Sequence, residues 1–140
     1  MKTKIVTLLT LAGLGLGLSL ASLPAVAEIV VIVNPKNPAS RMFGEQASQF
    51  FIGKSNQFTP IEHNDGAAIR TEFHQKVLGK EPAQVKAIWS KLVFTGKGQA
   101  PKEYGSSAEV KKAVAADPNA IGYIEKSAVD DSVKVILTVP

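Results

Sequence analysis

One run of β-branched residues constrains the fold more than any other feature of the sequence. Residues 29–33 read IVVIV, and no polar side chain interrupts them. Side chains alternate between the two faces of a strand, so an unbroken apolar run predicts a central strand that is buried on both faces. Such strands are typical of parallel sheets whose two faces are covered by helices. The run therefore predicts an α/β domain with this strand at its centre.

The remainder of the chain alternates between helix and strand patterns, which fits this class. Helices are predicted at 44–51, after a glycine turn at 66, from Pro82 onward, and from a capping box at 106–109 up to Asp117. Further strands are predicted at 61–63, 120–124 and 133–137, with an exposed connector at 99–102. About four strands and about four helices then pack in layers around one sheet.

The first 27 residues have the pattern of a secretory signal peptide. A positively charged start with Lys2 and Lys4 precedes a long apolar stretch, and residues 24–27 read PAVA, a motif with the small residues of a processing site. We expect cleavage after this motif, which leaves residues 28–140 as one domain. The alternative is an uncleaved membrane anchor, but the proline of the motif breaks helices and favours removal.

The amino-acid composition excludes several kinds of site and partner for this chain. The chain contains no cysteine, which excludes disulfides, a thiol nucleophile and a cysteine-bound metal. Its formal net charge is +4, but the lysines are scattered, and Lys2 and Lys4 belong to the leader, so we expect no nucleic-acid partner. An exported chain without disulfides fits the bacterial periplasm. After cleavage we expect no stable insertion into a membrane.

Few side chains are suited to catalysis. The two histidines, His63 and His74, are not spaced as metal ligands on a helix, and no recognisable nucleophile accompanies them. The glycine loop at 94–98 lacks the lysine-serine ending of a nucleotide-binding loop. We expect His74 to point to solvent and Trp89 to pack in the core with its helical neighbours. The sequence therefore predicts a protein that is not an enzyme and uses neither cofactor nor metal.

The stretch from Ile61 to Phe73 is the strongest candidate for a binding site. It predicts a strand, a tight turn at Gly66 and the start of a helix, with Asp65 placed to cap the free N–H groups of the first helical turn. A strand followed by a glycine turn and a helix N-terminus is the general design of an anion site. Turns of this kind also occur in α/β domains that bind nothing, so the pattern alone leaves both interpretations open.

Short motifs occur along residues 28–140 in a recognisable combination. They are Asn34-Pro35, Phe51-Ile52-Gly53-Lys54, Asp65-Gly66 with Arg70 and Phe73, Lys76-Val77-Leu78-Gly79, Trp89 with Phe94-Thr95-Gly96-Lys97, and Gly122-Tyr123. Together they resemble the short, single-domain relatives of the periplasmic phosphate-binding proteins that serve phosphate ABC transporters. The resemblance implies an α/β fold, namely a single lobe of the type II periplasmic-binding-protein-like fold, with a central mixed or mostly parallel sheet flanked by helices. It also implies a non-enzymatic substrate-binding role linked to ABC transport.

Full-length receptors of this family carry a turn of the form RxDGSGT that holds phosphate. On this chain the arginine position falls on His63, while the aspartate and the first glycine are kept as Asp65 and Gly66. Two hydroxyl donors are lost, and a permanent cation is replaced by one that titrates near neutral pH. The resemblance thus implies weak binding of a small phosphate-like anion, and binding that weakens from about pH 6 to 8 if His63 supplies the charge. The serine, glycine and threonine positions are Ala67, Ala68 and Ile69.

The predicted site combines this turn with the loop after the first strand, which we expect to lie opposite the turn. Two arginines, Arg41 and Arg70, are candidates for the missing cation. Besides a small anion, the resemblance implies a protein partner in the envelope, either a transporter permease or a sensor. The alternative is an envelope adaptor that uses the lobe as an interaction scaffold and binds no ligand. The predicted ligand-binding residues are Asn34, Ser40, Arg41, His63, Asp65, Gly66, Ala67, Ala68, Ile69 and Arg70.

Overall fold

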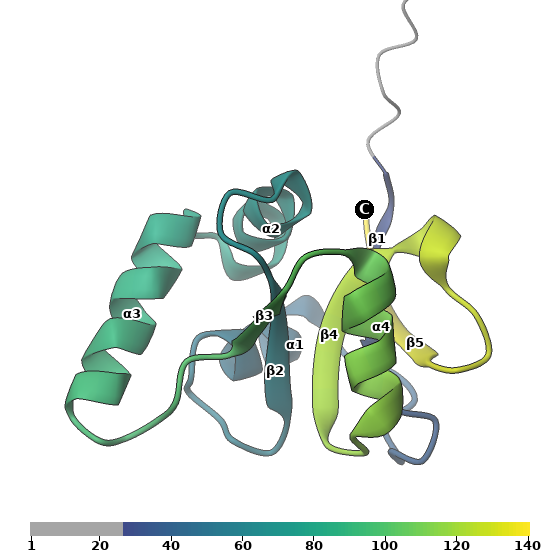
Figure 1. Ribbon diagram of the computed structural model, residues 1–140, viewed down its shortest axis with the longest axis horizontal. Coiled ribbons are helices and arrows are strands. Elements are labelled where there is room, and N and C mark those ends of the chain that lie inside the picture. Colours follow the sequence, from purple (N-terminus) through teal and green to yellow (C-terminus); the bar gives the residue numbers. More distant parts are fainter. Residues whose placement is uncertain (1–26) are drawn as a thin grey trace, which may run out of the picture.

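A computed structural model describes residues 27–140 of the chain (Figure 1). The predicted signal peptide lies, except for its last residue, outside the described residues. The elements follow one another as β1 (Ile29–Val33), α1 (Gly44–Phe51), β2 (Thr59–His63), α2 (Ala68–Phe73), the π-helical turn η1 (His74–Leu78), α3 (Pro82–Phe94), β3 (Lys102–Tyr104), α4 (Ser107–Ala116), β4 (Ala120–Glu125), the 3-10 turn η2 (Lys126–Ala128) and β5 (Lys134–Val139). No helix among residues 27–140 has the length and apolar character needed to span a membrane.

The strands form one mixed five-stranded sheet in the order β3-β2-β4-β1-β5. Strand β2 is parallel to both β3 and β4, whereas β1 is antiparallel to both β4 and β5. The predicted fold class, a mixed α/β sheet flanked by helices, is confirmed. The prediction that β1 belongs to a parallel arrangement was wrong, because burial on both faces reports helices above and below the strand and not the direction of its neighbours.

Strand β1 supplies side chains to two core layers, and all five of its residues are buried. Val31 lies in the layer covered by α1, α2, η1 and part of α3, whereas Val30 and Ile32 lie in the layer covered by α4. Figure 1 shows α4 in front of the sheet, α1 behind it, and α3 beyond the β3 edge. The double-sided burial that the apolar run predicts is therefore present.

Glycine at position 122 allows α4 to lie close to the sheet. A methyl group at Gly122 would stand 3.0 Å from Val110 and 3.1 Å from Val114. These two valines are fully buried, as the helical spacing predicts. Helix α4 begins where the capping box places it, since the Ser106 side chain accepts a hydrogen bond from the backbone N–H of Glu109.

The helix after the glycine turn is less regular than the sequence predicts. Helix α2 passes into the π-helical turn η1, which ends at Gly79 with the left-handed φ of 63° expected for a C-cap. His74, predicted to be solvated, is fully buried, so that prediction was wrong. His74 can be buried because its ring forms a hydrogen bond with the buried carboxylate of Glu62 on β2.

Candidate functional site

The two halves of the predicted site lie at opposite ends of the sheet. Val33, at the end of β1, and Pro60, near the start of β2, both pair with Ile121 of β4. The loop after β1 therefore lies at the end where β2 begins, while His63 lies at the end where β2 finishes. The expectation that the loop 34–41 faces the turn was wrong, because β1 runs against β2 and β4 and not with them.

Asn34, Ser40 and Arg41 have structural or surface positions. The buried side-chain amide of Asn34 donates to the carbonyls of Val114 and Ala115 at 3.1 and 2.9 Å, and so it ties the end of β1 to the last turn of α4. Ser40 is exposed, and the guanidinium of exposed Arg41 lies 5.5 Å from the ring centre of Phe43. The polar groups of Asn34 are engaged within the fold and do not face a cavity with the turn.

The glycine turn forms as predicted, but its aspartate does not cap the helix that follows. Gly66 adopts a φ of 84°, which favours glycine. Helix α2 is capped at Ala67, with no side-chain hydrogen bond, so the prediction that Asp65 caps the helix was wrong. The Asp65 carboxylate instead pairs with Nζ of Lys86 on α3 at 3.1 Å, and this bond lowers the pKa of Asp65. Ala68 is exposed on the first helical turn, while Ile69 packs partly against the core.

His63 lies inside the fold and not in front of the turn. Its ring is buried, and Nε2 donates to the carbonyl of Tyr123 at 2.8 Å. Burial lowers the pKa of His63 below its ordinary 6.5, although the Tyr123 carbonyl acts in the opposite direction. The ring is therefore neutral near pH 7. The cation titrating near neutral pH, which the sequence suggests for His63, does not match this buried position.

A buried polar cluster surrounds Glu62, a residue that the sequence did not single out. Glu62 is only 2% exposed, and its two carboxylate oxygens accept from the Tyr123 hydroxyl at 2.5 Å and from His74 Nε2 at 2.8 Å. Burial and the nearby Glu62 carboxylate raise the pKa of Tyr123. The Tyr123 ring stacks on Phe73, with ring centres 3.8 Å apart. The cluster joins β2, β4 and the α2–η1 helix at the end of the sheet that carries the turn.

Arg70 connects this cluster to the surface. The residue is 7% exposed, and its Nη1 donates to the His63 carbonyl at 2.9 Å and to the Glu103 carboxylate on β3. Its Nε lies 3.8 Å from Glu62, too far for a hydrogen bond, and has no other partner among residues 27–140. The Glu103 side chain is 45% exposed. Arg70 is among the predicted site residues, whereas Glu103 is not, because the three residues of β3 carry no strand pattern in the sequence.

A groove of about 470 Å³ opens above Arg70, between α3 and the β2–β3 edge. Glu62, Arg70 and Glu103 lie along its floor, and the Asp65–Lys86 pair lies at its rim. Trp89 is half-buried and is fixed by a hydrogen bond from Nε1 to the Phe51 carbonyl at 2.8 Å. The apolar walls come from Val85, Trp89, Val93 and Phe94 of α3 and from Ala100 and Pro101 before β3.

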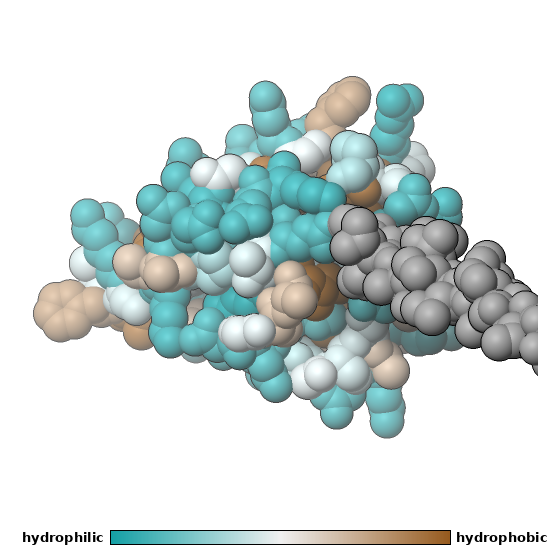
Figure 2. All heavy atoms as spheres, turned by 90° about the horizontal axis from the view of Figure 1, so that it is seen from above, coloured by the Kyte–Doolittle hydropathy of each residue, from teal (hydrophilic) through white to brown (hydrophobic). Residues whose placement is uncertain are grey.

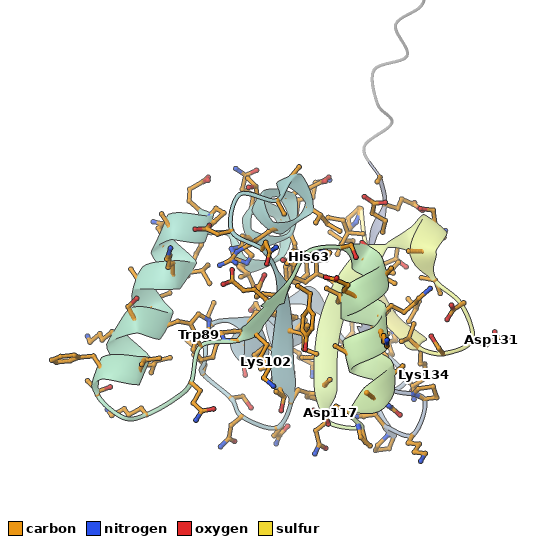
Figure 3. The ribbon with its side chains drawn as sticks, viewed as in Figure 1. His63, Trp89, Lys102, Asp117, Asp131 and Lys134 are labelled. Atoms are coloured by element: carbon orange, nitrogen blue, oxygen red, sulfur yellow. The ribbon has the colours of Figure 1, made fainter. Side chains whose placement is uncertain are left out.

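The surface around this groove is uneven in polarity. Figure 3 shows Trp89 on the side of α3 that faces the sheet, and His63 near the end of β2. Figure 2, a view from above, shows that hydrophilic side chains cover most of this end of the molecule and that an apolar side chain projects at the α3 side.

Within residues 27–140, no group of three or more histidine, aspartate or glutamate side chains is arranged to hold a metal ion.

Solved structures with a similar arrangement of elements include phosphate-transport receptors. They include an ABC-type phosphate transport receptor from Vibrio cholerae, with a TM-score of 0.59 and 19% identity. A protein from Clostridium perfringens, assigned as a phosphate ABC transporter substrate-binding protein and solved with bound phosphate, has a TM-score of 0.60 and 25% identity. PstS from Borrelia burgdorferi has a TM-score of 0.59 and 14% identity. The described residues share the fold of one part of these receptors.

The likeness covers one part of those receptors. Each alignment spans 79% of this chain but only 46%, 45% and 47% of the three receptor chains, so this chain spans less than half of their length. No protein-family model matches the sequence. A search of functionally curated proteins also finds no match. The neighbours are binding proteins and not enzymes, and at these identities they establish the fold alone.

Proposed function

We propose that the chain is a non-enzymatic, substrate-binding-like protein of the periplasm, exported by the signal peptide at residues 1–27, which binds a small phosphate-like anion weakly and acts with an ABC transporter. The observation that carries the proposal is the position of Arg70. This arginine lies on α2, just after the turn that corresponds to the phosphate-holding turn of the family. Its guanidinium reaches the His63 carbonyl at the end of β2 and lines the groove. The phosphate receptors that share the fold support the same class of function.

Several features of the turn explain why the binding is weak. His63 is neutral and buried, Asp65 is paired with Lys86, and Ala67 and Ile69 offer no hydroxyl. Each hydrogen bond missing from a charged ligand removes about 1.5–3 kcal/mol of binding free energy. Arg70 is therefore the cation on which anion binding depends, and a partner is needed to enclose the ligand more fully.

The proposal is tested by calorimetric titration of the mature protein with phosphate, sulfate and small carboxylates. We expect weak, saturable binding that Arg70→Lys reduces about tenfold, because lysine keeps the charge but loses the two-pronged geometry of the guanidinium. Arg41→Lys is the matched control, since Arg41 is exposed at the other end of the sheet, and it should bind like the wild type. If Arg41→Lys loses binding and Arg70→Lys binds like the wild type, the site lies at the Arg41 end of the sheet and the proposal is wrong.

A second candidate function is that of an envelope adaptor whose partner is a permease or a sensor. The observation that favours it is the exposure of apolar residues on α3, where Phe94 is 91% and Val93 48% exposed. Isolated apolar residues are common on protein surfaces, but these two adjoin an apolar groove. A photo-crosslinking residue at position 94 should then yield one specific adduct in cells, whereas the same residue at Phe43, the other exposed aromatic side chain, should yield none. Equal labelling at both positions would count against an adaptor surface on α3.

A further inference from the structure

The ion pair at the floor of the groove joins a buried partner to an exposed one. Arg70 is held by the His63 carbonyl and by packing, and its side chain is 8% exposed. Glu103 comes from a three-residue edge strand, and its side chain is 45% exposed. A carboxylate this exposed gains little from its ion pair, because water competes for the Glu103 carboxylate. Another carboxylate can therefore replace Glu103 on Arg70 with little loss.

The charges around Arg70 favour a ligand that carries one negative charge. The Glu62 carboxylate is already satisfied by Tyr123 and His74, and it stays in place beside Arg70. Exchange of Glu103 for a ligand carboxylate leaves the charge in direct contact with Arg70 unchanged. A phosphate dianion adds negative charge next to the buried Glu62 carboxylate, which lowers its affinity and agrees with the weak phosphate binding proposed above.

The walls of the groove favour a ligand with an apolar body. Trp89, Val93 and Pro101 line the same groove as the ion pair and give it apolar surface. The volume of about 470 Å³ lies within the range of about 300–1,000 Å³ typical of small-molecule sites. In such sites apolar walls supply most of the contact, and a few polar groups fix the orientation of the ligand. Here the polar group is Arg70, which lines the groove and donates from Nη1 to the Glu103 carboxylate.

From these observations we infer that the groove between α3 and β3 binds molecules with an apolar body and a single carboxylate, and that the ligand carboxylate displaces Glu103 from Arg70. The inference rests on the proposed function in one respect, since both place an anion on Arg70. It goes further because it makes the apolar body part of recognition and makes Glu103 an internal competitor. A free apolar acid and the C-terminal carboxylate of a polypeptide share this chemistry.

Trp89 allows a direct test, because it is the only tryptophan in the chain and lies in the groove wall. The mature protein is titrated with phenylbutyrate and, as the matched ligand, with the amide of the same acid, while tryptophan fluorescence is recorded. We expect a saturable change with the acid and binding about tenfold weaker with the amide, which lacks the charge. Equal binding of acid and amide, or no saturation by the acid up to about 10 mM, overturns the inference.

Variants test the exchange at Arg70. Glu103→Gln removes the competing charge and should tighten phenylbutyrate binding about two- to fivefold, the range expected for a partly exposed ion pair. Glu45→Gln removes an exposed charge from α1 on another part of the surface and should change nothing. Arg70→Lys should weaken binding about tenfold. Weaker or unchanged binding in Glu103→Gln contradicts the displacement of Glu103.

Two further arms separate the possible ligands and the two proposals. If polypeptide ends are the ligands, a peptide that ends in phenylalanine with a free carboxylate should bind and its amidated form should not. Binding of phenylbutyrate without binding of either peptide supports a small acid in the groove. Phosphate and sulfate are titrated in parallel by calorimetry. If they bind and phenylbutyrate does not, the inference fails and the proposed function stands. If no anion binds, both fail.

Discussion

Replacement of Tyr123 by phenylalanine tests whether the buried cluster holds this end of the sheet together. The change removes one hydroxyl and leaves the stacked ring in place. That hydroxyl donates to Glu62 at 2.5 Å, and the carboxylate is 2% exposed, so water cannot take over the bond. A hydrogen bond to a charged group contributes about 1.5–3 kcal/mol, so we expect a loss of about 2 kcal/mol in the free energy of unfolding. The Tm should fall by roughly 5–15 °C.

The measurement is urea unfolding of the mature protein, with the slope of the transition expected to stay unchanged. Tyr104→Phe is the matched control, because Tyr104 is the other tyrosine of the chain, lies on the edge strand β3 and makes no side-chain hydrogen bond within residues 27–140. Its effect should stay within about 0.5 kcal/mol. In a Glu62→Gln background the Tyr123→Phe loss should shrink by about 1 kcal/mol or more, because the two residues interact directly. Equal losses at the two tyrosines, or no coupling to Glu62, would refute the cluster as a stabilising unit.

Three further predictions concern pH, packing and processing. Because the pKa of His63 is lower in the folded chain than the ordinary 6.5, the unfolded chain binds more protons, so the stabilising contribution of neutral His63 should be complete above about pH 7 and fall as the solution is acidified. Urea unfolding at several pH values should show a smaller fall for His63→Gln than for the wild type. The same dependence of stability on pH in both proteins would count against this role of His63. Trp89→Ala should lower the free energy of unfolding by about 3 kcal/mol, since Trp89 is half-buried and bonded to Phe51, whereas Phe94→Ala on the same helix should change it by less than about 0.5 kcal/mol. Mass spectrometry of the exported protein should find Glu28 as the first residue, and retention of residues 1–27 would rule out the predicted cleavage.

The elements with strong local signals could be predicted from the sequence. Helix α1, the proline start of α3 and the capping box of α4 lie where their residues indicate, and the apolar run at 29–33 is a buried central strand. These features depend on side chains within a few positions of one another. Strand β3 could not be predicted, because three residues carry no periodicity and the strand exists only through its pairing with β2.

The site was harder to predict because it depends on contacts between distant parts of the chain. Glu62 and Tyr123 are 61 positions apart, and their hydrogen bond explains a buried glutamate that no local pattern reveals. The direction of β1 is equally invisible in an unbroken apolar run, and this direction separates Asn34 and Arg41 from the turn. Arg70 was identified through its place after the glycine turn, but its partner Glu103 required the position of β3.

The most direct test of the binding site is a two-dimensional NMR titration of the isotope-labelled mature protein. Phosphate and phenylbutyrate are added separately, and the shifted backbone amides are mapped onto the fold. The site described above predicts that the shifts cluster at the end of β2 and along the groove, in residues 62–70, 85–94 and 100–104, while residues 34–41 stay unchanged. Shifts centred on residues 34–41 would contradict the placement of the site at Arg70.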